Sequence, residues 1–399
     1  MHDRRRQEVT AAAWMVRTFR SAPQEYWDEL AVAACDEHLA YGVAETVAEA
    51  GQAVAAHADR LLACVRRRLG HGRFPRLWRD APRAHDGVAG DLLLALAGLG
   101  DVRAAPLLGA SLEQGSLRLL DRRHAPTVAA LPAAALLPAL RASLRTAPER
   151  DGHQTSLDVL GLWGPAAAAA VPELLVHTQG LHARPAVEAL GRIGPGAADA
   201  AEVLADLAAG RLRPYGWDPD ARPWHGDQAA AWAHWRVTGD DTAALAVCGA
   251  AARAGLGRPV LRYLADLGPA AARYADAVRA LLDAPGRWTR VGAAHAWWRI
   301  TGEAGPAVPV LVRELDQLER DPTEFYAVPT LEAVGHLGAI GTPAAAAAPV
   351  LHRLLSARRR TVRRWPCLPN ILEDEALRRA LTTTLTAVGT PDPTAAAPA

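Results

Sequence analysis

The sequence predicts an all-helical protein, an α–α superhelix built from stacked helical hairpins. Half of the 399 residues are hydrophobic but only 5% are aromatic, so a buried core must consist largely of Ala, Leu and Val. Small and γ-branched side chains suit closely packed helices, whereas a sheet favours β-branched and aromatic ones. A glycine-ended phrase also recurs along the chain at a spacing typical of two-helix repeats.

The recurring phrase is a helix that ends in Leu-x-x-Leu-Gly or Trp-Arg-x-Thr-Gly, often followed by Pro and a second Ala-rich helix. Glycine at the end of the first helix adopts a left-handed conformation without steric cost. Proline cannot continue that helix but is suited to start the next one. Apolar residues then recur every three or four positions, which predicts one buried stripe per helix. The clearest copies lie at 160–175, 190–207, 264–282, 300–315 and 337–355.

The turn glycines give the repeat length. Gly194 follows Gly164 by 30 residues, Gly268 follows Gly239 by 29, and Gly302 follows Gly268 by 34. A two-helix unit of this length is typical of HEAT repeats, and the chain has room for about eleven such hairpins. The copies resemble the short bacterial HEAT repeats related to bilin-lyase subunits, over nearly the whole chain. This resemblance implies a HEAT-like solenoid of bacterial origin.

The repeats divide the chain into five predicted segments. Two stretches, 70–87 and 210–227, are longer than an ordinary turn, and long loops of repeat arrays often lie on the working face. We predict N-terminal HEAT-like capping units at 1–87, central repeats at 88–209, a long aromatic and Arg-containing loop at 210–227, C-terminal repeats with Trp-Arg-x-Thr-Gly units at 228–370, and a C-terminal cap with a frayed tail at 371–399.

The loop at 210–227 is the first candidate for a contact site. Tryptophan, tyrosine and arginine together are typical of the residues that dominate protein–protein binding. In the alternative interpretation, which has equal weight, the tryptophans fold back onto the repeats. The candidate residues are Tyr215, Trp217, Arg222, Trp224 and His225.

Four further tryptophans lie in two copies of one motif, at 231–240 and 294–303. Trp235 and Trp298 occupy a position that is aliphatic in ordinary copies, so we expect both in the core. Trp232 and Trp297 do not align with each other. We therefore expect these two at the surface, where they could contact a partner.

A basic segment near the C-terminus is a candidate site for an anion or an acidic partner. No carboxylate occurs between these arginines and Glu373. Phosphate or acidic peptides bind such clusters, although most charge runs are solvated turns. The residues are Arg358, Arg359, Arg360, Arg363 and Arg364.

No catalytic residue, metal site or cofactor is predicted. The sequence has none of the His-Glu dipeptides that hold the irons of HEAT-fold hydroxylases, and no phosphate-binding glycine loop. None of its four cysteines forms a Cys-x-x-Cys pair. Cys35 and Cys64 each follow an alanine in similar helices 29 residues apart, so we expect them to be neighbours in space. We interpret them as buried structural thiols rather than a disulfide.

The leading functional interpretation is a non-catalytic scaffold or adaptor that binds a protein or peptide, because stacked repeats expose an extended surface. One alternative is a nucleic-acid binding protein resembling HEAT-like DNA glycosylases. The net charge of +1 disfavours it. A second alternative is a lyase-like enzyme subunit. Arg17 interrupts the N-terminal apolar run and no long uncharged apolar stretch follows, so we expect a cytoplasmic protein without a membrane partner.

Overall fold

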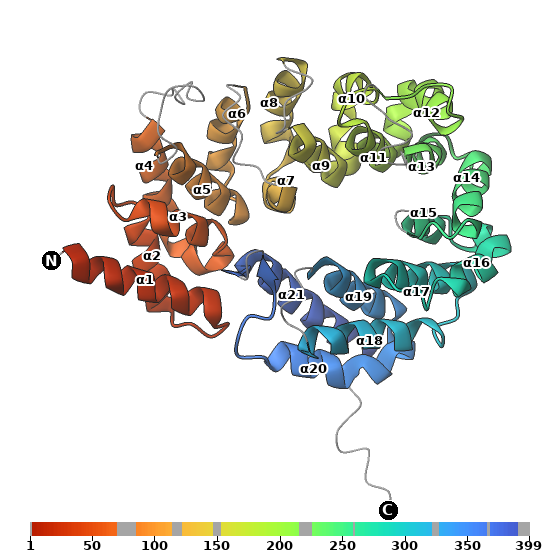
Figure 1. Ribbon diagram of the computed structural model, residues 1–399. Helices are drawn as coiled ribbons and strands as arrows, with labels where there is room; N and C mark the ends of the chain where they lie inside the picture. Colours follow the sequence, from red (N-terminus) through yellow and green to blue (C-terminus); the bar gives the residue numbers. More distant parts are fainter. Residues whose placement is uncertain are drawn as a thin grey trace, which may run out of the picture. The chain divides into compact units, whose positions relative to one another are not determined.

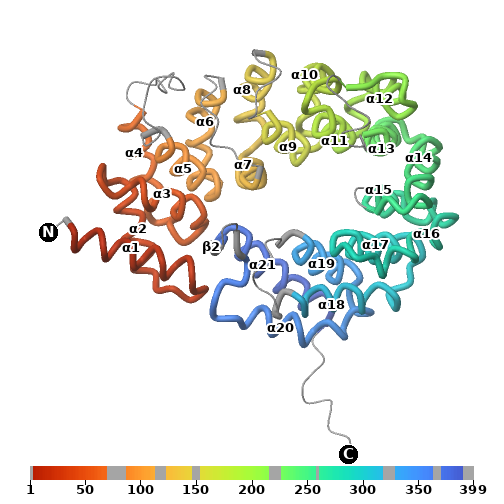
Figure 2. The backbone as a smooth tube through the Cα atoms, viewed as in Figure 1, coloured from red at the N-terminus to blue at the C-terminus, as the bar shows by residue number. Residues whose placement is uncertain are grey.

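Most of the residues that the computed structural model describes are helical (Figures 1 and 2). The expected all-helical class is confirmed. The exception, within the described part of the chain, is an antiparallel pair of two-residue strands, β1 (Arg363–Arg364) and β2 (Leu368–Pro369). Two compact units are formed, unit 1 by Met1–Val16 and Ala22–Ala243, unit 2 by Arg17–Ser21 and Ala244–Ala399. The described residues are 2–69, 85–113, 122–146, 153–214, 226–257, 260–320, 327–364 and 368–389.

The helices of unit 1 form two rows. They are α1 (His2–Thr18), α2 (Gln24–Ala33), α3 (Ala40–Ala48), η1 (Gly51–His57), α4 (Ala58–Leu69), α5 (His85–Gly98), η2 (Val102–Ala104), α6 (Ala105–Glu113), η3 (Arg122–His124), α7 (Ala125–Ala129), α8 (Ala133–Thr146), α9 (His153–Trp163), η4 (Gly164–Ala170), α10 (Val171–His177), α11 (Ala183–Ile193), η5 (Gly194–Ala200), α12 (Ala201–Ala208) and α13 (Gly226–Thr238). In one row, α3, α5, α7, α9, α11 and α13 each pack against the next; in the other, α6, α8, η4 and η5 do (Figure 1). Each helix therefore buries its apolar face mainly against neighbours in the sequence.

Unit 2 repeats this arrangement. Its elements are α14 (Thr242–Arg253), α15 (Val260–Leu267), η6 (Gly268–Tyr274), α16 (Ala275–Ala280), α17 (Arg287–Thr301), α18 (Ala307–Arg320), α19 (Ala327–Ile340), η7 (Thr342–Ala347), α20 (Ala348–Ser356), the two strands and α21 (Ile371–Val388). One row contains α15, α17, α19 and α21, each packed against the next. Helices α16, α18 and α20 lie against this row from one side (Figure 2).

The glycines of the recurring phrase have the backbone conformation that the sequence predicts. Gly164, Gly194 and Gly268 have positive φ angles of 54°, 72° and 57°, which residues with a side chain rarely adopt. Proline follows each of them, at the first positions of the next helix. The glycine ends one helix and the proline begins another, so the chain reverses within a few residues.

The second helix of the hairpin differs from the prediction, because it begins as a 3-10 helix. The helices η4, η5 and η6 span seven residues each before the α-helix continues. Each of these 3-10 helices packs against the following helix of the other row, α11, α13 and α17 respectively. A fully buried alanine stands at the same place in each of them, at Ala167, Ala197 and Ala271. The small methyl group allows the tight turn to lie close to its neighbour.

The predictions for the motif tryptophans were wrong. Trp232 and Trp297, expected at the surface, are only 6% and 5% exposed, whereas Trp235 and Trp298 are half-buried. Trp232 fits because its neighbour on α11 is Gly191, where a Cβ atom would collide with the indole ring. Trp297 lies on the buried side of α17, together with the buried residues three and four positions away from it. Which tryptophans are buried is therefore determined by the face of the helix on which they lie, and not by their alignment with the aliphatic position of ordinary repeats.

One stretch of the described residues, His153–His177, is long and apolar enough to cross a membrane by length and composition. Half of its apolar window is buried inside the fold. The stretch is also divided between α9, η4 and α10, and it carries Asp158 and Glu173. These features are typical of core helices.

We predict that Gly191→Ala destabilises unit 1, because the added Cβ would lie 2.9 Å from the Ala233 Cα and would also displace the Trp232 ring. Overpacking of this kind costs about 1–3 kcal/mol. In the control variant Gly42→Ala, the new methyl group meets nothing within 4 Å on the exposed side of α3. That change should stabilise by about 0.4–1 kcal/mol through a less flexible unfolded chain. Urea unfolding followed by circular dichroism measures both; equal effects of the two variants would contradict the packing argument.

Candidate functional site

The predicted loop contact site is not among the residues that the structure describes. Tyr215, Trp217, Arg222, Trp224 and His225 all lie outside the described ranges, and the prediction for them stays open. The other two predicted contact residues, Trp232 and Trp297, belong to the core as described above. The guanidinium of Arg279 also covers the Trp297 ring, 5.4 Å from its centroid.

The predicted anion patch is dispersed. Arg358 and Arg359 are exposed, with the Arg359 guanidinium over the Phe19 ring at 5.6 Å. Arg363 and Arg364 form strand β1, and their side chains are not described. Arg360 contradicts the prediction, because it is 5% exposed and its Nη1 donates to the Asp374 Oδ2 at 3.2 Å and the Glu375 Oε1 at 2.6 Å. Its charge is therefore neutralised inside unit 2.

A buried ion cluster surrounds Asp374 in unit 2. Arg20 binds this carboxylate with two parallel hydrogen bonds, Nη2 to Oδ1 at 2.8 Å and Nε to Oδ2 at 2.9 Å. The backbone N–H of Thr361 donates to Oδ1 at 2.9 Å, and Arg20 Nη1 donates to the Leu354 carbonyl at 2.6 Å. Burial alone would raise the pKa of Asp374, but the hydrogen bond and charge of Arg20 hold that pKa below its ordinary value. The cluster ties the segment Arg17–Ser21 to α20 and α21.

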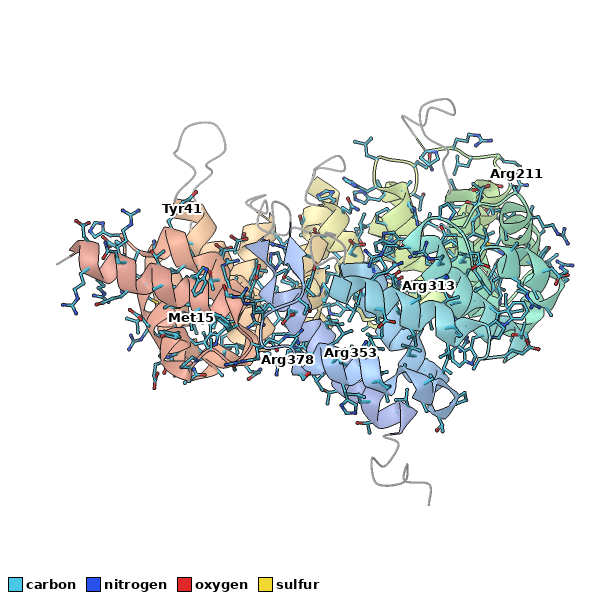
Figure 3. All side chains as sticks on the ribbon, turned by 60° about the horizontal axis from the view of Figure 1, so that its bottom comes forward. Met15, Tyr41, Arg211, Arg313, Arg353 and Arg378 are labelled. Atoms are coloured by element: carbon cyan, nitrogen blue, oxygen red, sulfur yellow. The ribbon has the colours of Figure 1, made fainter. Side chains whose placement is uncertain are left out.

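Two further arginines of unit 2, one exposed and one half-buried, are also paired with carboxylates. Arg353 and Arg378, both labelled in Figure 3, contact Asp316 at 2.9 Å and Glu375 at 3.0 Å. These pairs lie between neighbouring helices or within one helix. Of the basic run at 358–364, Arg360 is thus engaged in ion pairs inside the fold, whereas Arg358 and Arg359 are exposed.

Two histidines of unit 2 stack face to face. The rings of His295 on α17 and His336 on α19 have centroids 3.8 Å apart and are 8° from parallel. Burial, with Arg299 close by, lowers the pKa of His295 to about 4. Burial and the neighbouring His295 lower the pKa of His336 to about 3. Both rings are neutral at pH 7, so the pair acts as packing between two helices.

A carboxyl group of unit 1 is also strongly perturbed. Burial, with Glu45 nearby, raises the pKa of Asp91 to about 7, while Arg123 opposes this effect. Arg123 bridges Glu45 at 3.1 Å and the buried Glu49 at 3.6 Å. The positive charge is thus shared among several acids of α3 and α5. Among the residues that the structure describes, no group of three or more His, Cys, Asp or Glu side chains could hold a metal ion.

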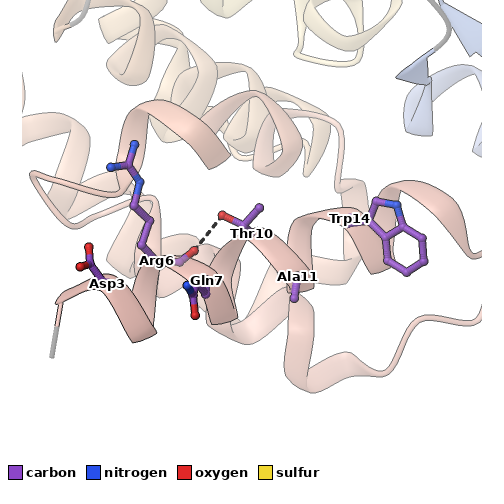
Figure 4. A pocket seen from close by; sticks show the side chains of 6 residues that line it. All are labelled: Asp3, Arg6, Gln7, Thr10, Ala11 and Trp14. Carbon is purple, nitrogen blue, oxygen red and sulfur yellow. Dashed lines mark hydrogen bonds between the residues drawn. The ribbon is translucent and has the colours of Figure 1, made fainter.

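The exposed face of α1 is the strongest candidate for a binding surface. Val9, Ala12 and Val16 form the buried stripe of this helix. The opposite side carries Trp14, whose side chain is 57% exposed. A shallow depression of about 690 Å³ runs along this side (Figure 4). It is lined by Asp3, Arg6, Gln7, Thr10, Ala11 and Trp14.

Local interactions stabilise α1 although much of it faces outward. Asp3 lies in the first turn and Arg17 in the last, so both charges interact favourably with the helix dipole. The Arg4 Nε and the Glu8 Oε1 are 3.0 Å apart in a pair one turn apart. The hydroxyl of Thr10 donates to the Arg6 carbonyl at 2.7 Å (Figure 4). This surface was not among the predicted sites, although the spacing of Val9, Ala12 and Val16 indicates that Trp14 faces away from the core.

No family model and no curated protein matches this chain. The crystal structure of an engineered protein aligns with 96% of this chain and 98% of its own length, at 14% sequence identity and a TM-score of 0.34. A likeness at that score carries no argument about fold or function.

We predict that Asp374→Asn destabilises unit 2, because it leaves the buried Arg20 and Arg360 without their shared counter-charge. Breaking a buried ion pair costs about 3–5 kcal/mol. The control Asp316→Asn removes a more exposed pair with Arg353 and should cost about 1 kcal/mol or less. Since the pKa of Asp374 lies below 3.8, its contribution persists above that pH and is lost as the pH falls further. Denaturant unfolding at neutral pH tests the difference, and equal losses would show that Asp374 is not the centre of the cluster.

We predict that protonation of the stacked histidines destabilises unit 2 in mild acid. Both pKa values are below the ordinary 6.5, so the unfolded chain binds more protons as the pH falls from 6.5 to about 4. Stability should therefore fall across this window, and His336→Phe should reduce the slope while it keeps an aromatic ring. The variant His352→Phe, which replaces an exposed histidine outside the stack, serves as the comparison. Urea midpoints measured across the window test this; an unchanged slope in His336→Phe contradicts it.

Proposed function

We propose that this chain is a HEAT-like repeat scaffold that binds a protein partner. The observation that carries the proposal is the packing order, in which each helix of a row contacts the next helix of the same row. Repeat arrays bury their apolar surface in this way, one unit against the next. The recurring glycine–proline turns add to this, because they divide the sequence into units of similar length.

The ionisable groups support a structural rather than a catalytic role. Glu173 is 5% exposed and accepts hydrogen bonds from Arg141 at 3.0 Å and Arg145 at 2.7 Å. Glu314, also buried, pairs with Arg287 in the same manner. Carboxylates held by arginines of a neighbouring helix connect the units of an array, and their charges are already engaged.

The face of α1 fits an amphipathic helix of the partner. Residues 3, 7, 10 and 14 lie on one side of α1 at alternating spacings of four and three. A second helix packs its side chains between such rows. Trp14 offers a large apolar anchor, and Ala11 leaves room beside it for a partner side chain. Arg6 stands about two turns from Trp14 on the same helix. Trp and Arg are both enriched at the energetic centres of interfaces.

The predicted loop at 210–227 remains a second contact region in this proposal. Its aromatic and arginine residues supply the same chemistry as the α1 face. A partner that uses both surfaces would gain affinity from two linked contacts.

We predict that Trp14→Ala weakens partner binding strongly. The full-length tagged chain is used to capture its partner from lysate of the native host, with and without nuclease, and the affinity of the purified pair is then measured. Loss of an aromatic anchor costs about 2 kcal/mol or more, which corresponds to about 30-fold in Kd. Ala11→Arg should have a similar effect by filling the depression.

The matched control is Leu181→Ala, because Leu181 is exposed and apolar but lies between α10 and α11. It should leave the affinity unchanged. Equal affinities of wild type and Trp14→Ala would refute the α1 surface. Capture that disappears with nuclease treatment would refute the protein partner itself.

A further inference from the structure

Two cysteines of unit 1 face each other across neighbouring helices. Cys35 stands in the turn after α2 and Cys64 lies within α4, close enough for each thiol to shift the pKa of the other. No disulfide joins the two sulfurs in the structure. Cys64 is only 2% exposed, whereas Cys35 is half-buried, so the pair is reached from the Cys35 side.

Arginines fix the position of both cysteines. Arg67 Nη2 contacts the Cys64 sulfur at 3.9 Å and donates to the Cys35 carbonyl at 3.1 Å. Arg68 Nη2 donates to the Asp36 carbonyl at 3.1 Å, next to Cys35 in the chain. The Cys35 sulfur also lies 3.9 Å from the Arg60 carbonyl. These bonds tie the turn after α2 to α4 and hold the two sulfurs in register.

The surroundings shift the pKa values of the two thiols in opposite directions, which gives them different roles. The hydrogen bond from Cys35 lowers the pKa of Cys64, and the charges of Arg68 and Arg67 act in the same direction. The same hydrogen bond raises the pKa of Cys35, with burial adding to it. The geometry favours the same division, because the Arg67 guanidinium lies 3.9 Å from the Cys64 sulfur while the Cys35 thiol donates to the Arg60 carbonyl. A thiolate beside arginines is the reactive form of cysteine, whereas a thiol among apolar side chains is inert.

We propose that Cys35 and Cys64 form a redox-active dithiol that a peroxide converts into a disulfide. The Cys64 thiolate attacks one oxygen of hydrogen peroxide; the O–O bond breaks, hydroxide leaves, and Cys64 becomes a sulfenic acid. The Cys35 thiol then attacks the Cys64 sulfur, the S–O bond breaks, and water leaves with the Cys35 proton. The two cysteines lose two electrons in total, and the peroxide is reduced to water.

The disulfide would close a loop of 29 residues that contains α3 and η1. It would join the turn after α2 covalently to α4, where arginine hydrogen bonds already hold the two together. Oxidation is therefore expected to stabilise this part of unit 1 without rearranging it. The two sulfurs thus serve as a modification site and not only as small core residues.

The test uses the full-length reduced protein and hydrogen peroxide added in stoichiometric steps. Trypsin digestion without reductant follows, with free thiols blocked. Cleavage after arginine places Cys35 in the peptide 21–60 and Cys64 in the peptide 61–66. The proposal predicts that these two peptides become linked and that the mass of the pair falls by two hydrogen atoms. Cys64 should react at least about tenfold faster than an ordinary buried thiol.

Variants separate the two roles. Cys35→Ser should leave the Cys64 sulfenic acid without a resolving thiol, so that dimedone labels the peptide 61–66. Cys64→Ser should abolish the fast reaction. The control Cys248→Ser removes a fully buried cysteine of α14 and should leave formation of the cross-link unchanged. Arg67→Gln should slow the reaction several-fold.

The proposal is overturned if wild-type protein with an unchanged circular dichroism spectrum keeps both thiols free, or if Cys64 reacts no faster than Cys248. Because the linked peptides are sought first in the wild-type chain, a variant that fails to fold does not affect this result.

Discussion

The structure depends on how closely one helix can approach the next across small side chains. In the turns after α9, α11 and α15, a glycine with positive φ ends one helix and a 3-10 helix begins immediately. A buried alanine in that 3-10 helix then meets the following helix of the neighbouring row. A larger residue there would separate the helices, and the aliphatic contacts on either side would lose their partners. The alanine-rich composition is therefore a requirement of the packing.

Close packing also explains where large side chains can stand. Trp232 is buried because Gly191 leaves space for its ring, and Tyr274 lies against Gly249 in the same way. Each of these two rings thus occupies space that a glycine on a neighbouring element leaves open. A single sequence cannot show which glycine faces which ring, because the two residues of a pair lie on different helices. For that reason the tryptophans of the repeated motif were assigned to the wrong sides.

Local features of the sequence predicted the all-helical class and the glycine–proline turns, but not the contacts between residues far apart in the chain. The positive φ of Gly164 and the proline after it follow from rules that operate within a few residues. The ion pair between Arg20 and Asp374 joins residues 354 positions apart, and no local pattern connects them. The same holds for Arg360, which the sequence places in a basic run and the fold places beside two acids. The α1 face could have been found, since Trp14 falls outside the apolar stripe of its own helix.

The use of arginine in place of lysine bears on function as well as on stability. Arg20 holds Asp374 through two parallel bonds and also donates to a backbone carbonyl, which requires the planar fork of a guanidinium. Arg67 similarly contacts the Cys64 sulfur and donates to the Cys35 carbonyl at the same time. Each of these two arginines joins neighbouring elements of the fold. Basic runs in this sequence therefore do not by themselves indicate a phosphate-binding surface. A better candidate for a partner is a surface such as the α1 face, where an aromatic ring is exposed beside small and polar residues.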